Sequence, residues 1–202
     1  MNGMKSYLSA ASIALVLCLF MGCGENGCKP EATPEQLTRE GWDRFEDNQY
    51  QGALLKFDQA LGRDPGHGEA YNGVGWCCAN LDSLEAGIDA FDHAISHGVI
   101  TADPRAGKAV IYRDLEPVDF QTAIGWADSA LAIDSDYVFS HDTSLDWKDL
   151  RLILAHSYYG LSQYDEAKAQ VDILNPGNTL DPGSDTYVED LLAEIQRLGD
   201  EI

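Results

Sequence analysis

The sequence between residues 40 and 98 contains one pattern of small and aromatic residues twice. The first set is Gly41, Trp42, Ala53, Phe57 and Ala60, and the second set is Gly75, Trp76, Gly87, Phe91 and Ala94. Every member of the second set lies 34 residues after its counterpart. A two-helix unit that recurs at this period is typical of a helical solenoid, in which stacked hairpins share a continuous core. We therefore expect an all-α fold of stacked hairpins, with an irregular helical bundle as the alternative.

The pattern resembles the tetratricopeptide repeat (TPR) family. In that family a glycine and large residues lie on a first helix, Ala-x3-Phe-x2-Ala follows on a second helix, and a proline often closes the repeat. The first copy also has Tyr50 and Pro65, and the second has Tyr71. The second copy departs from the family at Gly87, where alanine is usual, and it lacks the closing proline. The resemblance implies a right-handed solenoid whose first helices line a concave groove.

Two weaker copies and a final helix extend the array. We predict a solenoid domain over 33–202, with repeats at 34–67, 68–101, 104–137 and 148–181 and a capping helix at 184–198. In the third repeat, Ala123, Ala127 and Ala130 lie 36 residues beyond their counterparts. The fourth repeat is displaced further, and the excess predicts a loop insertion between Tyr137 and Trp147. A terminal helix with a polar outer face is what a solenoid needs at its end.

The N-terminal residues have the pattern of an export signal. Lys5 precedes an apolar run from Tyr7 to Phe20, so residues 1–22 predict a cleaved signal peptide. Phe20-Met21-Gly22-Cys23 resembles a bacterial lipoprotein cleavage site, which implies lipidation of Cys23; an ordinary cleaved signal is the alternative. Residues 23–32 then predict the lipidated cysteine and a flexible tether. The resemblance implies a lipid-anchored protein of the bacterial cell envelope. Gly24 is not the aspartate that retains some lipoproteins at the inner membrane, which favours the periplasmic face of the outer membrane.

The charge of the chain limits its partners. It has 34 acidic and 13 basic residues and a net charge of -21. Such a surface repels nucleic acid and anionic lipid headgroups, and it favours basic or neutral partners. A generic acidic surface of an exported protein is the alternative explanation. We therefore expect a protein or peptide partner and no nucleic acid.

Helical spacing predicts which residues line the groove. The residue after each repeat's glycine, or after its equivalent, is aromatic in all four repeats: Trp42, Trp76, Tyr112 and His156. The same face adds Phe45, Glu69, Asn72, Arg105, Lys108 and Tyr159. Rigid aromatic and charged residues are frequent in protein interfaces. We predict that Trp76 is the central contact. The alternative is that the rings fill the solenoid's own inner packing. A combination of the two interpretations has the outer rings packed and the middle rings open.

The sequence favours a binding function over catalysis. It contains no nucleophile motif, phosphate-binding loop or nucleotide fingerprint, so we expect neither an enzyme nor a cofactor. A scaffold that binds a partner peptide, for example during assembly of an outer-membrane or surface complex, is the main interpretation. A binder of small apolar or glycan ligands is its alternative. Asp89, His93 and His97 could hold a metal, although a solvated helix face is the simpler interpretation.

Two adjacent cysteines also need an explanation. Cys77 and Cys78 point about 100 degrees apart on a helix, so they cannot easily bond each other. We expect Cys78 to pack toward the second helix. Cys77 is either free or paired with Cys28 on the tether.

Overall fold

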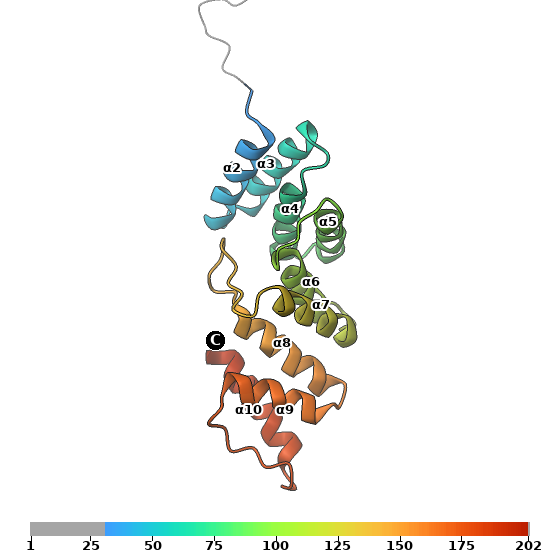
Figure 1. The fold of residues 1–202 in the computed structure, drawn as a ribbon, viewed down its shortest axis with the longest axis vertical. Helices are drawn as coiled ribbons and strands as arrows, with labels where there is room; N and C mark the ends of the chain where they lie inside the picture. Colours follow the sequence, from blue (N-terminus) through green and yellow to red (C-terminus); the bar gives the residue numbers. More distant parts are fainter. Residues whose placement is uncertain (1–30, 202) are drawn as a thin grey trace, which may run out of the picture. The chain divides into compact units, whose positions relative to one another are not determined.

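The computed structural model describes residues 31–201, and the chain from Thr33 onward forms one unit. Within this range the chain forms nine helices and no strand, apart from one isolated bridge (Figure 1). The helices are α2 (Pro34–Glu46), α3 (Tyr50–Arg63), α4 (Gly68–Asn80), α5 (Leu84–Ser96), α6 (Asp103–Asp114), α7 (Phe120–Ile133), α8 (Trp147–Gly160), α9 (Tyr164–Leu174) and α10 (Tyr187–Glu201). The predicted all-α fold of four stacked hairpins and a final helix is confirmed.

The N-terminal predictions fall outside this range. The export signal, the lipidation site at Cys23 and the tether cysteine Cys28 all precede residue 31. Among the helices from residue 34 to residue 201, none is long and apolar enough to cross a membrane.

Local sequence sets the helix ends. Thr33 accepts a hydrogen bond from the backbone N–H of Gln36, whose side chain accepts one from the N–H of Thr33, so a capping box starts α2. Three residues join the helices of the first, second and fourth hairpins. The middle residue of each turn has a positive φ: 58° at Asn48, 54° at Asp82 and 60° at Ser162. Short polar side chains suit this left-handed conformation better than bulky or β-branched ones.

A phenylalanine from each second helix forms the centre of the N-terminal core. Phe57 on α3 and Phe91 on α5 are fully buried. Phe57 lies against Gly41 of its own hairpin and Gly73 of the next, where an added Cβ would come within 2.5 and 2.3 Å of the ring. Phe91 lies against Gly75 and Gly107 in the same way, at 2.5 and 2.2 Å. Each ring therefore holds two neighbouring repeats together.

The third repeat corrects one of our predictions. Gly107 takes the place of Gly73, so α6 keeps the 34-residue period of the first helices. The two extra residues lie in the turn between α6 and α7, which has five residues (115–119) where the other hairpins have three. The prediction that pairs Tyr112 with Trp76 places the 36-residue offset in α6 instead. The predicted register of this helix is therefore wrong by two positions, which is more than half a turn.

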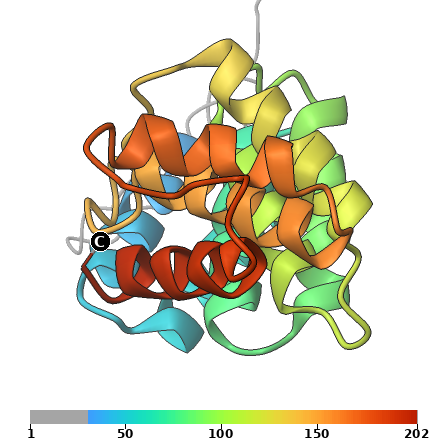
Figure 2. The ribbon, with the colours of Figure 1, turned by 90° about the horizontal axis from the view of Figure 1, so that it is seen from below.

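The last helix packs on the fourth hairpin. α10 contacts α8 and α9, and Figure 2 shows α9 and α10 side by side at the end of the stack. Tyr187, Leu191, Ile195 and Leu198 are buried in one cluster with residues of α8 and α9. These four residues form the apolar face that the sequence indicated, and α10 occupies the place that the first helix of another repeat would take.

Candidate functional site

The candidate site is the groove formed by one face of the first helices α2, α4, α6 and α8. These helices contact one another in sequence order. Trp42 and Phe45 of α2 and Glu69 and Trp76 of α4 line clefts in its N-terminal half, and Asn72 of α4 is fully buried.

Lys108, a predicted groove residue of α6, faces the second helices instead. Lys108 is 3% exposed, its ammonium contacts the carboxylate of Asp92 on α5, and it lies 4.0 Å from the centre of the Trp126 ring on α7. Burial raises the pKa of Tyr112, and the carboxylates of Asp92 and Asp119 raise it further. Arg105 donates to the carbonyl of Thr101. With the corrected register, Val110 and Arg113 take the groove positions, and both line a cleft beside Trp76.

The predicted insertion folds back into the N-terminal half of this groove (Figure 1, gold). Val138 and Asp146 form an antiparallel bridge. The N–H of Phe139 donates to the carbonyl of Leu145 at 2.9 Å, and the N–H of Trp147 donates to that of Tyr137 at 2.7 Å. The insertion, defined as residues 137–147, is therefore a short hairpin with internal hydrogen bonds.

Phe139 is the centre of the contact between insertion and groove. Its side chain is 1% exposed, and its ring stacks on Trp76 with 4.2 Å between centroids. It also makes edge contacts with Trp42 at 6.0 Å and Phe45 at 5.9 Å. Trp76 consequently keeps only 4% exposure. The expectation that the middle rings are open is wrong for Trp76, because the insertion covers it.

His141 makes the second contact. Its ring lies flat on Trp42, with centroids 3.9 Å apart and 1° between planes. Its Nδ1 lies 2.8 Å from Oε1 of Glu46. At the base of the insertion, Tyr137 is 2% exposed, and burial together with the charge of Asp103 raises the pKa of its hydroxyl. Polar as well as aromatic groups thus hold the insertion in place.

The groove floor contains polar atoms that the insertion does not pair. Asn72 is fully buried, and its amide donates to Glu69 at 3.4 Å. Among residues 31–201, Asn72 Oδ1 and Trp76 Nε1 have no hydrogen-bond partner. Burial raises the pKa of Glu69, while the bond from Asn72 opposes that shift. Native interiors pair nearly all such buried groups, so these two atoms are exceptions in the packing of α4.

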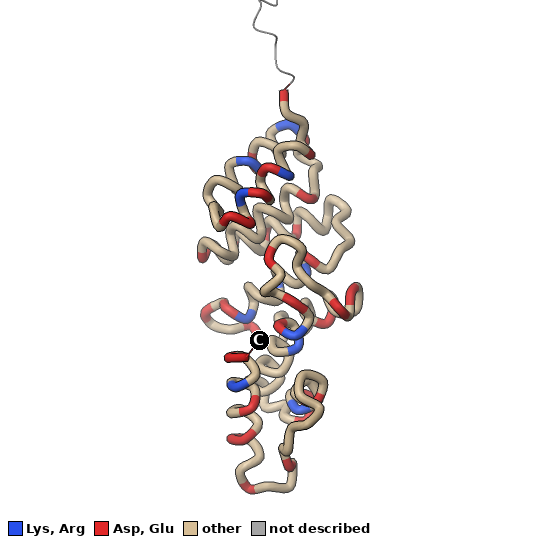
Figure 3. The backbone as a smooth tube through the Cα atoms, turned by 90° about the vertical axis from the view of Figure 1, so that its left-hand side faces the viewer, with Lys and Arg blue, Asp and Glu red and all other residues tan. Residues whose placement is uncertain are grey.

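Two clefts flank the insertion. One holds about 320 Å³ and is lined by Glu35, Thr38, Arg39, Trp42, Asp43, Glu46, His67, Glu69 and His141. The other holds about 340 Å³ and includes Val110, Arg113, Asp114 and Asp149. We call the first of these the acidic cleft, because four carboxylates line it against one arginine and two histidines. Figure 3 shows that acidic positions also outnumber basic ones along the rest of the unit.

The C-terminal half of the groove ends at α10. His156 and Tyr159 of α8 lie on the predicted face and are half-buried. Burial and the positive charge of Arg113 lower the pKa of His156. Tyr159 and Leu152 pack against the α10 cluster, so α10 closes this end.

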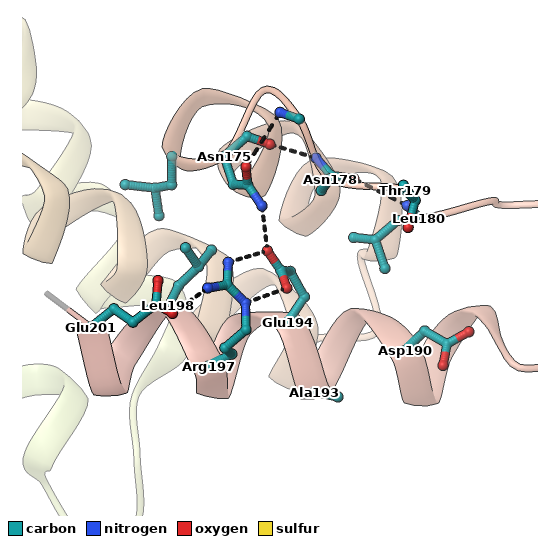
Figure 4. Close-up of a pocket in the computed structure, with 12 residues that line it drawn as sticks. Asn175, Asn178, Thr179, Leu180, Asp190, Ala193, Glu194, Arg197, Leu198 and Glu201 are labelled. Atoms are coloured by element: carbon teal, nitrogen blue, oxygen red, sulfur yellow. Dashed lines mark hydrogen bonds and ion pairs between the residues drawn. The ribbon is translucent and has the colours of Figure 1, made fainter.

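A polar cleft between α10 and the segment after α9 is larger than the two clefts beside the insertion, but its central polar side chains pair with one another. It holds about 840 Å³ (Figure 4). Glu194 accepts from Asn175 at 2.8 Å and pairs with Arg197 at 2.7 Å, and Arg197 also pairs with Glu201 at 2.5 Å. These central groups satisfy one another, which suits a structural role.

The cysteines and histidines outside the groove also have defined surroundings. Cys77 and Cys78 are unbonded and buried, and burial raises the pKa of Cys77 to about 12. His93 and His97 are stacked with Tyr71, with centroids 4.9 and 5.5 Å from its ring. Between residues 31 and 201, no group of three side chains is placed to bind a metal.

Comparison with known proteins places this architecture among the TPR solenoids. Residues 38–107 match the model of the tetratricopeptide repeat family. The chain resembles the crystal structure of YrrB, a TPR protein with an unusual peptide-binding site, at TM-score 0.60 and 17% identity over 82% of each chain. It resembles MamA at TM-score 0.57 and 18% identity, over 83% of this chain and 81% of that one. It also resembles a thermophilic TPR protein of Thermus thermophilus at TM-score 0.54 and 16% identity, over 83% and 89%. No curated protein matches the sequence. The fold is therefore TPR-like.

Proposed function

We propose that this protein is a non-catalytic scaffold that binds a segment of another protein in the groove of its first helices. We further propose that a lipid on Cys23 holds it at the bacterial cell envelope, at the periplasmic face of the outer membrane. There it would keep its partner close to the membrane, for example during assembly of a surface complex.

The binding proposal rests on one observation: the groove already holds a segment of this chain, the insertion. A stretch of polypeptide lies across Trp42, Phe45 and Trp76, held by one aromatic and one imidazole side chain. A surface that holds its own chain in this manner has the chemistry to hold a foreign segment, because ring stacking and polar contacts to exposed carboxylates do not depend on chain connectivity.

A small apolar or glycan ligand is the second candidate. The rings that such a ligand needs lie beneath Phe139, and the two clefts beside the insertion are open rather than enclosed. Small-ligand sites are usually enclosed and mostly apolar. The groove therefore favours a polypeptide.

Photo-crosslinking in the native envelope tests the binding proposal. A photoreactive phenylalanine analogue in place of Val110 lies in the groove, and the same group in place of Leu55, 57% exposed on α3, serves as a surface control. We expect a discrete crosslinked adduct from position 110 and none from position 55. Adducts from position 55 alone would move the partner to another face.

The anchor makes a separate prediction. Cys23→Ser removes the thiol that the lipid would be attached to, so the variant should appear in the soluble fraction or remain unprocessed, because an exported chain without acyl groups has little membrane affinity. Fractionation with intact-mass measurement checks this, and Cys28→Ser is the matched control. A Cys23→Ser protein that is cleaved normally and still sediments with membranes would place the anchor elsewhere.

A further inference from the structure

The insertion contacts the groove as a bound segment does. Phe139 and His141 reach residues of α2 and α4, and the His141–Glu46 contact joins positions 95 residues apart in the sequence. Phe139 occupies a cage formed by Trp42, Phe45 and Trp76, and His141 lies between an aromatic face and a carboxylate. These are two recognisable sites, one for an aromatic ring and one for a cationic or imidazole group.

The floor beneath these two sites is only partly satisfied. Asn72 Oδ1 and Trp76 Nε1 are buried, and no atom between residues 31 and 201 pairs with them. Leaving buried polar groups unpaired opposes the closed arrangement. An incoming polypeptide brings backbone N–H and C=O groups that could pair with such atoms. The floor is therefore better suited to an exchangeable occupant than to a permanent apolar plug.

The acidic cleft indicates the charge of that occupant. It opens beside His141 and Trp42, and Glu35, Asp43, Glu46 and Glu69 line it. Glu46 is half-exposed, so a group arriving from solvent can reach it. A guanidinium or ammonium group would stack on the Trp42 ring and pair with Glu46 more strongly than a neutral imidazole does. A basic side chain is thus the natural competitor of His141.

We propose that the insertion is a displaceable placeholder, and that the groove's partner is a peptide segment carrying an aromatic residue with an arginine or lysine within two positions of it. The aromatic side chain takes the place of Phe139 and the basic one takes the place of His141. This inference rests on the proposed function and specifies its partner. Because the insertion is tethered at both ends, its effective concentration at the groove is high, and a partner must compete against it.

Direct binding measurements test the placeholder. The probe is a fluorescent synthetic peptide with this chain's sequence from 136 to 146, together with its His141→Arg, His141→Glu and Phe139→Ala forms. The receptors are the full mature chain in detergent, its Phe139→Ser/His141→Ser double variant, and Thr143→Ala, an exposed change at the tip of the insertion, as the matched control.

We expect the double variant to bind the probe at least about tenfold more tightly than the wild type or Thr143→Ala, because its own competitor is gone. The His141→Arg peptide should bind more tightly than the parent peptide, and the Phe139→Ala peptide about tenfold more weakly. Equal affinity for wild type and double variant would overturn the placeholder. Preference for the His141→Glu peptide would overturn the basic partner.

Hydrogen exchange on the wild-type chain gives the same answer if the double variant fails to fold. The Phe139 N–H is bonded to Leu145, and saturating His141→Arg peptide should speed its exchange while leaving amides of α7 unchanged. Unchanged protection at Phe139 with the peptide bound would contradict displacement.

The two proposals fail in different ways. If position 110 gives crosslinks but the peptides do not displace the insertion, the placeholder is rejected and the scaffold function stands. If the peptides displace the insertion but position 110 gives no crosslinks in the envelope, the scaffold function is rejected instead.

Discussion

Replacing Phe91 with alanine is expected to lower the free energy of unfolding by about 3–5 kcal/mol, which is the usual cost of removing a fully buried aromatic side chain. The ring has 0% exposure, lies against Gly75 and Gly107, and makes an edge contact with Trp76 at 5.5 Å. Its loss would open a cavity between the second and third repeats. Because each repeat is stabilised mainly by its neighbours, the array has few other contacts to compensate.

Chemical denaturation followed by circular dichroism measures this effect. Ile100→Ala is the matched control, because Ile100 is 79% exposed and its truncation should change stability by less than about 0.5 kcal/mol. A Phe91→Ala protein with an unchanged denaturation midpoint would show that the ring is not packed between α4 and α6.

The second large effect concerns two helical glycines. Gly107→Ala should destabilise the protein by about 1–3 kcal/mol, because its Cβ would lie 2.2 Å from the tip of the Phe91 ring and force the two repeats apart. Gly125→Ala is expected to do the opposite. It lies in α7 with no neighbouring atom within 4 Å of an added Cβ, so alanine should stabilise the helix by about 0.5–1 kcal/mol.

Thermal or chemical unfolding of both variants tests the register of α6. Opposite signs support the register in which Gly107 faces Phe91. If Gly107→Ala is also stabilising, the register shifted by two residues is correct, and Lys108 and Tyr112 would then face the groove.

The repeat period predicted much of the fold. Phe57 and Phe91 recur at the same spacing because each occupies the same space between two glycine-containing first helices, so one pattern indicates both their burial and the hairpins around them. The groove residues of α2 and α4 followed from the same spacing. Where copies are regular, sequence distance and spatial position correspond.

The register of the third repeat was harder to predict from the sequence, because its two extra residues could lie at more than one place in the repeat. The alanines of α7 revealed their number but not their position. Two signals pointed to the turn between α6 and α7: Gly107 lies 34 residues after Gly73, and Pro117 lies in a stretch too long for a standard turn. These signals identify Val110 and Arg113 as groove residues.

No local sequence pattern predicted that residues 137–147 would lie in the groove. Residues 137–147 were recognisable as an insertion, since they interrupt the period. Their contacts with Trp42 and Trp76 are long-range, and no spacing rule connects an irregular loop with a helix so distant in the sequence. Tyr137 and Phe139, at the start of the segment, are the aromatic residues that become buried there.

The nuclear Overhauser effect between the ring protons of Phe139 and those of Trp76 tests the central claim most directly. The stacked geometry, with 4.2 Å between centroids, predicts strong cross-peaks, and a second set between His141 and Trp42 should accompany them. Loss of both sets when the His141→Arg peptide is added would follow from displacement. Absence of both sets in the free protein would contradict an insertion that fills the groove.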